Sequence, residues 1–318
     1  MKTHDHEVHR MHAMSALTNP DAGQVVWSPK KSLWFFAHLL IATVGGVMTF
    51  GEAPVLLSAL LTVVTLCLGH TVGLHRLLIH RSFECPKWLE RLLVYLGTLV
   101  GMGGPFGMIY LHEIRDWAQR HGHCHPFFIH RAGFWRDAWW NLHAEIRLEN
   151  PPRLEIEPER ANDPFYRLLE RTWMLQQLPL AVLLYVFGGW SWVVWGISVR
   201  IVTSLTGHWL IGHLAHNIGE RDWHLEGHAV QGFNLPHLGL LTMGECWHNN
   251  HHAYPNSARL GLHRGQADPG WWFIALLRRL GLARQVRLPE NLPPRPERIP
   301  LPCATRPRRR LSARFDLL

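Results

Sequence analysis

The sequence predicts an all-α integral membrane protein with four transmembrane helices in two hairpins and a cytoplasmic helical domain that carries a histidine-rich di-metal site. Three observations predict this fold class. Apolar residues are concentrated in two long blocks, positive charge flanks these blocks but is absent from the short links within them, and histidines cluster at the block ends.

The two apolar blocks cover residues 33–72 and 174–216. The chain as a whole is 47% hydrophobic and 18% charged, and its mean hydropathy of −0.05 resembles that of a soluble protein. Because a membrane-spanning helix needs about 20 mainly apolar residues, each block is long enough for two spans. The alternative is a soluble protein with two buried helical hairpins. It is disfavoured because runs of this length with so few charges are unusual in soluble cores.

Each block is interrupted near its middle by helix-breaking residues. The first contains FGEAP at residues 50–54 and the second contains FGGWS at residues 187–191. Glycine and proline punctuate helices, and both links are short enough only for tight hairpins. Spans are therefore predicted near residues 32–50, 54–74, 174–189 and 191–212.

Positive charge decides the predicted orientation. Neither hairpin link contains Lys or Arg, whereas Lys30 and Lys31 precede the first span and arginines are frequent between the blocks and in the tail. Positive residues favour the cytoplasmic side, so both termini and the metal site are predicted to be cytoplasmic. The net charge of +8 lies mostly beside the membrane segments, where it can face anionic lipid, and no nucleic-acid partner is predicted.

The ends of the chain differ in composition from its middle. Residues 1–30 are rich in histidine and charge, lack the apolar core of a signal peptide and are predicted to form a disordered arm. Residues 289–318 form a Pro- and Arg-rich tail that is predicted to be irregular, which leaves residues 31–288 as the membrane domain. The five Cys form no CxxC pair and predict neither a disulfide framework nor a cysteine zinc site.

The histidines beyond the arm cluster at the ends of the predicted second and fourth spans, in the central region and in GECWHNNHHAYP at residues 244–255. The predicted topology places every cluster on the cytoplasmic side, so that they can meet in one site. The clusters are His70, His75 and His80; His112, His121, His123, His125 and His130; His208, His213 and His216; and His248, His251 and His252.

Spacing within two clusters bears on metal ligation. His248, His251 and His252 are at i, i+3 and i+4, so that one helix face can present all three rings. His75 and His80 are five residues apart, which does not align on an α-helix. These two are therefore expected to serve different metals or to lie where the helix ends.

The number of imidazoles predicts two metals. Neutral imidazole suits iron, copper, zinc and nickel, and the four clusters offer more ligands than the four that zinc takes. Carboxylates are sparse beside the histidines. Glu245 and Asp116 are therefore predicted to hold ring nitrogens in place.

Three motifs together resemble the membrane fatty-acid desaturases of the acyl-CoA desaturase type. They are HRLLIHR at residues 75–81, GHLAHNIGERDW at residues 212–223, and GECWHNNHHAYP. The resemblance covers roughly residues 30–285. It implies a cytoplasmic centre of two iron ions that uses O2 to remove two hydrogens from a long saturated acyl chain, on acyl-CoA or a similar carrier. It also implies an apolar tunnel for the chain and a separate electron donor resembling cytochrome b5, ferredoxin or rubredoxin.

The middle histidine motif departs from the family pattern RDHxxHH. Arg115 and Asp116 are present, but Trp117 and Arg120 replace the first two histidines and His121 takes the third position. His121 is carried over directly, and His125, His123 and His112 are candidate substitutes. Gly212 replaces an Asn of the family. The ligand set that the resemblance implies is His75, His80, His121, His125, His216, His248, His251 and His252.

Two other functions compete with desaturation. A lipid hydroxylase or other oxygenase would use the same di-iron site, and the motif spacing does not separate it from a desaturase. A histidine-rich membrane metal transporter is disfavoured, because transporters place ligands near the middle of the bilayer whereas these histidines cluster at span ends.

Overall fold

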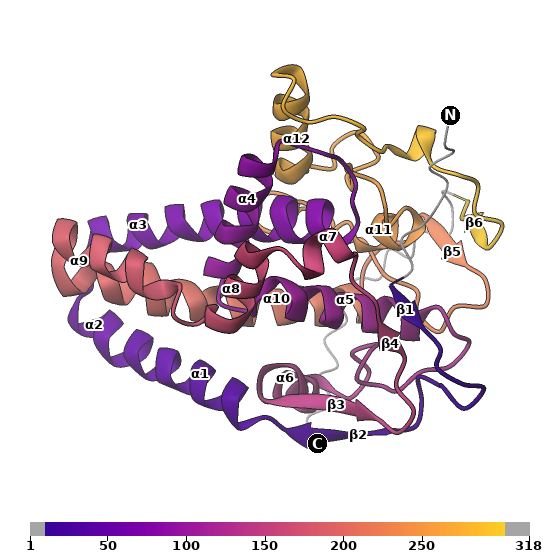
Figure 1. The fold of residues 1–318 in the computed structure, drawn as a ribbon, viewed down its shortest axis with the longest axis horizontal. Helices are drawn as coiled ribbons and strands as arrows, with labels where there is room; N and C mark the ends of the chain where they lie inside the picture. Colours follow the sequence, from indigo (N-terminus) through magenta and orange to yellow (C-terminus); the bar gives the residue numbers. More distant parts are fainter. Residues whose placement is uncertain (1–9, 303–318) are drawn as a thin grey trace.

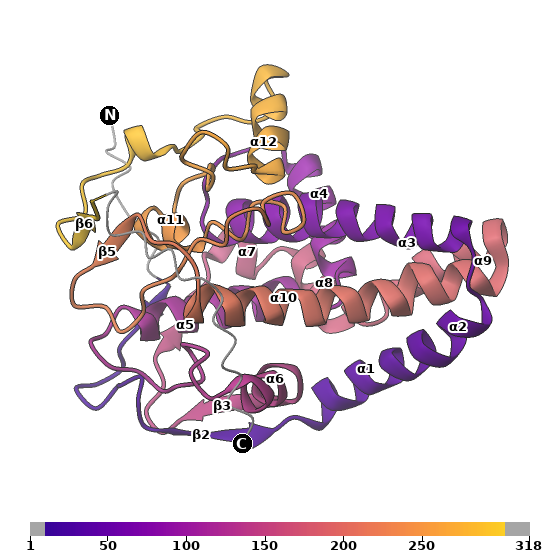
Figure 2. The ribbon, with the colours of Figure 1, turned by 180° about the vertical axis from the view of Figure 1, so that it is seen from behind.

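The computed structural model describes residues 10–302, which are mostly helical with three two-stranded sheets (Figure 1). The long helices extend toward one end of the molecule, and the shorter elements gather at the other (Figures 1 and 2). The prediction of an all-α fold thus holds for most of the chain but did not include the sheets. The predictions for residues 1–9 and 303–318 lie outside the described residues.

The first hairpin contains two helices that are long and apolar enough to cross a membrane, over 20 and 28 residues. Pro29 begins the first of them at a position where its missing N–H costs nothing. The elements of this hairpin are α1 (Pro29–Leu40), the π-helical η1 (Ile41–Gly45), α2 (Gly46–Met48), α3 (Glu52–Val63) and the π-helical η2 (Val64–Ile79).

The π-helical winding of η2 brings His75 and His80 together. In a π-helix each N–H bonds to the carbonyl five residues earlier, so residues five apart share a face. The N–H of His80 donates to His75 O at 3.0 Å, and the two ring centroids are 4.8 Å apart. His80 is also the residue that ends the helix, as one of the two expectations had it.

A third apolar helix covers 41 residues, Gln177–Asn217, but the chain reverses within it at Gly189. This glycine has φ 64° and ψ −159°, far from helical values. In a straight helix, residues 12 apart would be separated by about 18 Å. A Cβ on Gly196 would instead lie 2.5 Å from Leu184 Cδ1, so the two halves pack against each other as a hairpin. The elements on either side of the reversal are α9 (Gln177–Val193), η3 (Val194–Val199) and α10 (Arg200–Asn217).

Glycine lets η2 pack closely against α4 (Lys87–Leu99). A Cβ on Gly69 would lie 2.3 Å from the backbone carbon of Leu96, and one on Gly73 would lie 2.5 Å from Leu93 O. Small residues four apart allow two helix backbones to approach in this way. The contact buries η2 almost completely and holds its histidine-bearing end in place.

Shorter helices build the other end of the molecule. Aspartates precede two of them and cap their N-termini: Asp163 accepts from the Phe165 N–H and Asp268 from the Trp271 N–H, both at 2.9 Å. These helices are α5 (Pro105–Gln119), α6 (Phe134–His143), α7 (Pro158–Ala161), α8 (Pro164–Thr172), α11 (His248–Ala253), α12 (Pro269–Arg279) and the 3-10 turn η4 (Pro289–Asn291).

Each small antiparallel sheet joins strands that are distant in sequence. The first described residues, predicted to be part of a disordered arm, supply two of these strands, and Arg10 beside them is only 1% exposed. Long-range pairing of this kind leaves no local signal in a polar segment. The pairs are β1 (Met11–His12) with β4 (Arg153–Leu154), β2 (Gly23–Trp27) with β3 (Ala144–Leu148), and β5 (Trp223–Leu225) with β6 (Arg298–Pro300).

The arrangement of the helices brings the histidine clusters together. The turn between α2 and α3 and the reversal in α9 lie at one end of the molecule (Figures 1 and 2). The last turns of η2 and α10 lie at the opposite end, next to α5 and α11. Both long hairpins therefore point their histidine-bearing ends into the same region.

Candidate metal centre

Seven histidines form two groups in which imidazole nitrogens face one another. Within each group, one nitrogen of every residue lies within 4.8 Å of the corresponding nitrogens of the others. The first group is His75, His80, His112 and His251, and the second is His216, His248 and His252.

The short helix α11 contributes histidines to both groups. His248 and His252 are four residues apart on one face, with ring centroids 4.5 Å apart, and belong to the second group. His251 points to the first group, where its ring lies 4.7 Å from that of His75. The rings of His251 and His252 are 5.8 Å apart, so the two groups are neighbours.

Oxygen atoms beside the rings, one in a hydrogen bond and one in a close carboxylate contact, indicate which ring nitrogen faces inward. His216 Nδ1 lies 2.7 Å from Gly212 O, and His75 Nδ1 lies 2.8 Å from Glu245 Oε2. Carbonyl and carboxylate oxygens only accept, so Nδ1 carries the hydrogen and the Nε2 lone pair faces the group. Asp116 Oδ2 lies 3.5 Å from His112 Nδ1, so both carboxylates that were predicted to hold ring nitrogens lie beside such atoms.

The inward nitrogens approach one another closely. His248 Nε2 lies 3.3 Å from His216 Nε2 and 3.0 Å from His252 Nε2, and His80 Nε2 lies 3.3 Å from His112 Nε2. Converging lone pairs repel each other unless a proton or a metal ion lies between them. Metal-binding histidines typically donate the N–H of the ring nitrogen that faces away from the metal to such an acceptor. The donor set therefore fits a transition metal in each group.

Burial keeps these imidazoles in the neutral form that metal ligation requires. It lowers the pKa of His248 to about 3 and holds the pKa values of His80, His251 and His252 well below their usual range. Burial opposes ionisation of Glu245, but the neighbouring His75 and Arg76 hold the pKa of its carboxyl well below the usual value. The carboxylate is therefore charged at neutral pH.

Two buried arginines hold the histidine-bearing end of η2, and Arg76 is the first of them. Arg76 is fully buried and donates to Ala258 O and to Asp268 Oδ1, both at 2.7 Å. Asp268 is the residue that caps α12, so this contact ties the histidine-bearing end of η2 to the segment after α11.

Arg10 forms the second anchor at the last turn of η2. Its guanidinium donates to Leu78 O and Ile79 O at 3.0 and 2.9 Å and to Glu113 Oε1 at 2.9 Å. Glu113 follows His112 in α5. One side chain thus links the carbonyls just before His80 to the helix that carries His112 of the first group.

The structure brings six of the eight histidines of the implied ligand set into the two groups, and His121 and His125 lie outside them. His121, just after α5, has its Nδ1 2.8 Å from Trp117 O of that helix, and His125 Nδ1 accepts from the Phe127 N–H at 3.2 Å. Their place in the first group is taken by His112, one of the candidate substitutes.

A third cluster, which the sequence does not reveal, surrounds Asp137 of α6. Asp137 is fully buried, and its Oδ2 lies 2.9 Å from Nδ1 of both His130 and His213 and accepts from Trp209 Nε1 at 2.8 Å. Burial alone would raise the pKa of Asp137, but the hydrogen bonds from His130 and His213 hold it well below the usual value. The carboxylate binds α6 to α10 beside the second group. The single acidic residue in the aromatic run WRDAWW is its sequence signal.

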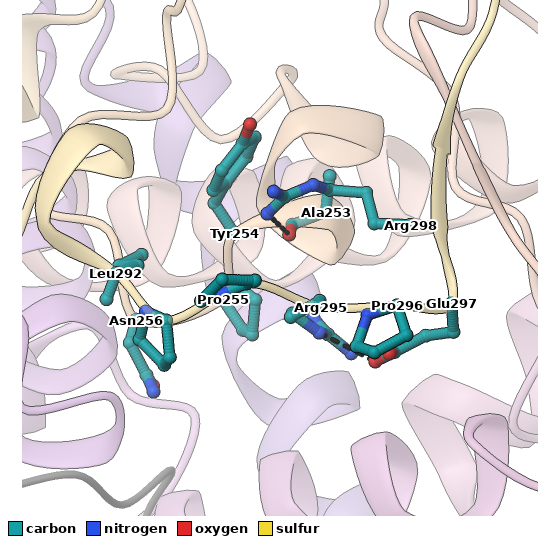
Figure 3. A pocket seen from close by; sticks show the side chains of 11 residues that line it. Ala253, Tyr254, Pro255, Asn256, Leu292, Arg295, Pro296, Glu297 and Arg298 are labelled. Carbon is teal, nitrogen blue, oxygen red and sulfur yellow. Dashed lines mark hydrogen bonds and ion pairs between the residues drawn. The ribbon is translucent and has the colours of Figure 1, made fainter.

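The start of the predicted irregular tail lies against the end of α11 (Figure 3). Arg295 donates to His252 O at 3.0 Å, and Arg298 lies over the ring of Tyr254, 3.9 Å from its centroid. A pocket of about 250 Å³ lies between this segment and the residues after α11. The described part of the tail therefore braces the helix that serves both histidine groups.

Comparison with known proteins agrees with the motifs. The family model for fatty acid desaturases matches residues 50–268. The chain is 36% identical to the sn-1 stearoyl-lipid 9-desaturase of Anabaena variabilis over 76% of this chain and 87% of that protein. It is 36% identical to the sn-2 palmitoyl-lipid 9-desaturase of a Nostoc species, over 69% and 76%. It is 34% identical to an acyl-CoA 5-desaturase of Anemone leveillei, over 77% and 75%. The chain belongs to the fatty acid desaturase family.

Proposed function

We propose that the protein introduces a double bond into a long saturated acyl chain at a centre of two iron ions. Two hydrogens leave the chain while O2 is reduced to two molecules of water, with two electrons from a separate donor protein and two protons from water. The observation that carries this proposal is the pair of adjacent histidine groups that share α11 at one end of the apolar helices.

Seven histidines would hold the two ions. His121 and His125, which the family pattern implies, lie outside both groups, and we propose that His112 replaces them in the first. Bound iron would supply the oxidising power that breaks unactivated C–H bonds, because no side chain can do so. The full proposed ligand set is His75, His80, His112 and His251 for one ion and His216, His248 and His252 for the other.

The surrounding residues orient these ligands and keep water away. Glu245 and the carbonyl of Gly212 hold the outer nitrogens of His75 and His216, which directs both Nε2 lone pairs inward. Arg10 and Arg76 fix the last turn of η2 by charged hydrogen bonds. Burial of most of these groups excludes the water that would otherwise quench reactive species.

We propose that the helices cross the membrane four times, with the hairpin tips outside and both termini and the metal centre in the cytoplasm. The reversal at Gly189 supports a division of the 41-residue apolar helix into two spans. The lipid and acyl-CoA desaturases among the relatives support a substrate that is an acyl chain on a lipid or on coenzyme A.

Iron analysis and lipid product analysis together test the proposal. Purified protein should contain two iron ions per chain, and cells that express it should form unsaturated chains two mass units lighter than the substrate. His112→Ala should lower iron content, whereas His121→Ala is its matched control on the same segment and should not. Products that gain an oxygen atom would instead indicate a hydroxylase, and iron-free active protein would refute the metal assignment.

A further inference from the structure

Two histidines lie on the membrane side of the metal centre and belong to neither group. His70 of η2 is five residues before His75, so the π-helical winding places it one turn deeper on the same face, with the two rings 6.4 Å apart. His208 of α10 is two turns before His216. The rings of His70 and His208 meet edge to face at 4.8 Å. This pair therefore bridges η2 and α10 directly beneath the metal centre.

Neither ring has a hydrogen-bond partner among residues 10–302. His70 is 7% exposed, and its Nδ1 is enclosed without a partner. One turn before His208, Ser204 is 1% exposed and its Oγ also lacks a partner within the described chain. By contrast, His38 on the first apolar helix lies 3.0 Å from Ser198 Oγ. Most buried polar groups find a partner in this way.

Unpartnered polar groups inside apolar helices are costly unless something else binds them. The cost applies to the enclosed His70 Nδ1 and Ser204 Oγ, whereas His208 is exposed and presents its ring to whatever lies beside α10. Ionisable residues within membrane helices commonly mark a substrate path. Two imidazoles alone are too few for a third metal site, and the pair is absent from the groups of potential ligands that the described residues form.

The position of His70 and His208 favours a polar group of the substrate's acyl chain as their hydrogen-bond partner. A chain that reaches the metal centre from the bilayer runs beside the turns of η2 and α10 that lie beneath it, and His70 and His208 lie on these turns. A purely methylene chain there would leave both rings unpaired. A neutral imidazole has one N–H donor and one lone pair, so the pair can both donate to and accept from a hydroxyl group.

We propose that His70 and His208 bind an oxygen atom carried by the acyl chain a few carbons from those that react, so that the enzyme prefers a hydroxylated acyl chain. This inference rests on the proposed desaturase function. A site built to hydrogen-bond a substrate hydroxyl can reject the analogue that lacks it by a factor of up to about 10⁴. Even the loss of a single hydrogen bond of about 1.4 kcal/mol gives a tenfold preference.

The test compares acyl chains of equal length that are either unsubstituted or hydroxylated at successive positions. Cells that express the full chain receive each substrate, and mass spectrometry gives the fraction desaturated. We expect one positional isomer to be converted at least about tenfold better than the unsubstituted chain. The double variant His70→Leu/His208→Leu should lose this preference, and the matched control His38→Leu should keep it.

A binding measurement on the iron-loaded protein, without its electron donor, keeps the test independent of turnover. The preferred hydroxylated chain should raise the Tm of the wild type more than the unsubstituted chain does, and this difference should vanish in His208→Leu. His208 is exposed, so its replacement disturbs packing little. Equal conversion of all chains by the wild type would show that water occupies the pair and would overturn the inference. Absence of any oxidised product from any chain would instead refute the desaturase function.

Discussion

Replacing Arg10 with methionine tests whether the segment before the first apolar helix is part of the metal centre. The guanidinium is 1% exposed and contacts Leu78 O, Ile79 O and Glu113 in the last turn of η2 and in α5. Methionine is apolar and similar in length to arginine. The change therefore removes the charge and the hydrogen bonds while largely filling the space.

The magnitude follows from what the substitution leaves behind. Removing one partner of a buried ion pair costs about 3–5 kcal/mol, because the other charge stays buried and unpaired. Burial already raises the pKa of Glu113 to about 7, so this carboxyl can take up a proton and soften the loss. We therefore expect a decrease of about 3 kcal/mol in the free energy of unfolding. We also expect weaker iron binding to the first group, because His80 follows the freed carbonyls.

The assay combines denaturant unfolding in detergent with iron content and iron spectroscopy. Arg147→Met is the matched control, because Arg147 is exposed on β3. The control should change stability by no more than about 0.5 kcal/mol and leave both iron sites intact. Equal stability and equal iron spectra for the two variants would refute the role assigned to Arg10.

Three further changes probe other parts of the structure. Glu245→Gln removes the carboxylate at His75 and should weaken iron binding about 10- to 100-fold, measured by competition with a chelator. The pKa of Asp137 lies below its unfolded value of about 4, so its stabilising contribution is complete above that pH and is lost as the pH falls through the folded value. Asp137→Asn should therefore lower the Tm at pH 7 and flatten its decline below about pH 4; an unchanged acid profile would contradict this. Gly73→Ala places a Cβ 2.5 Å from Leu93 O and should cost about 1–3 kcal/mol in unfolding measurements, whereas Gly207→Ala, where nothing lies within 4 Å, should not.

The apolar segments and the last histidine motif were predictable because their signals are local. Length and hydropathy marked the long helices, and Gly189 lies within the predicted break at residues 187–191. The spacing of His248, His251 and His252 predicted that one helix face presents all three rings; α11 does begin at His248, but the single face was wrong, because His251 points to the other group. The division of these rings between two groups was not predictable, because it depends on what packs on each side of α11.

The sequence by itself determined the composition of this protein's parts: apolar runs long enough to cross a membrane, their breaks, and the histidines near their ends. Only the tertiary structure decided which histidines meet. It replaced His121 and His125 with His112, because α5 packs against η2 with His112 facing the group. It also joined His75 to His80 through π-helical winding and placed Arg10 beneath η2. Spacing reports only neighbours along the chain, whereas a metal site depends on side chains that long-range packing brings within a few ångströms of one another.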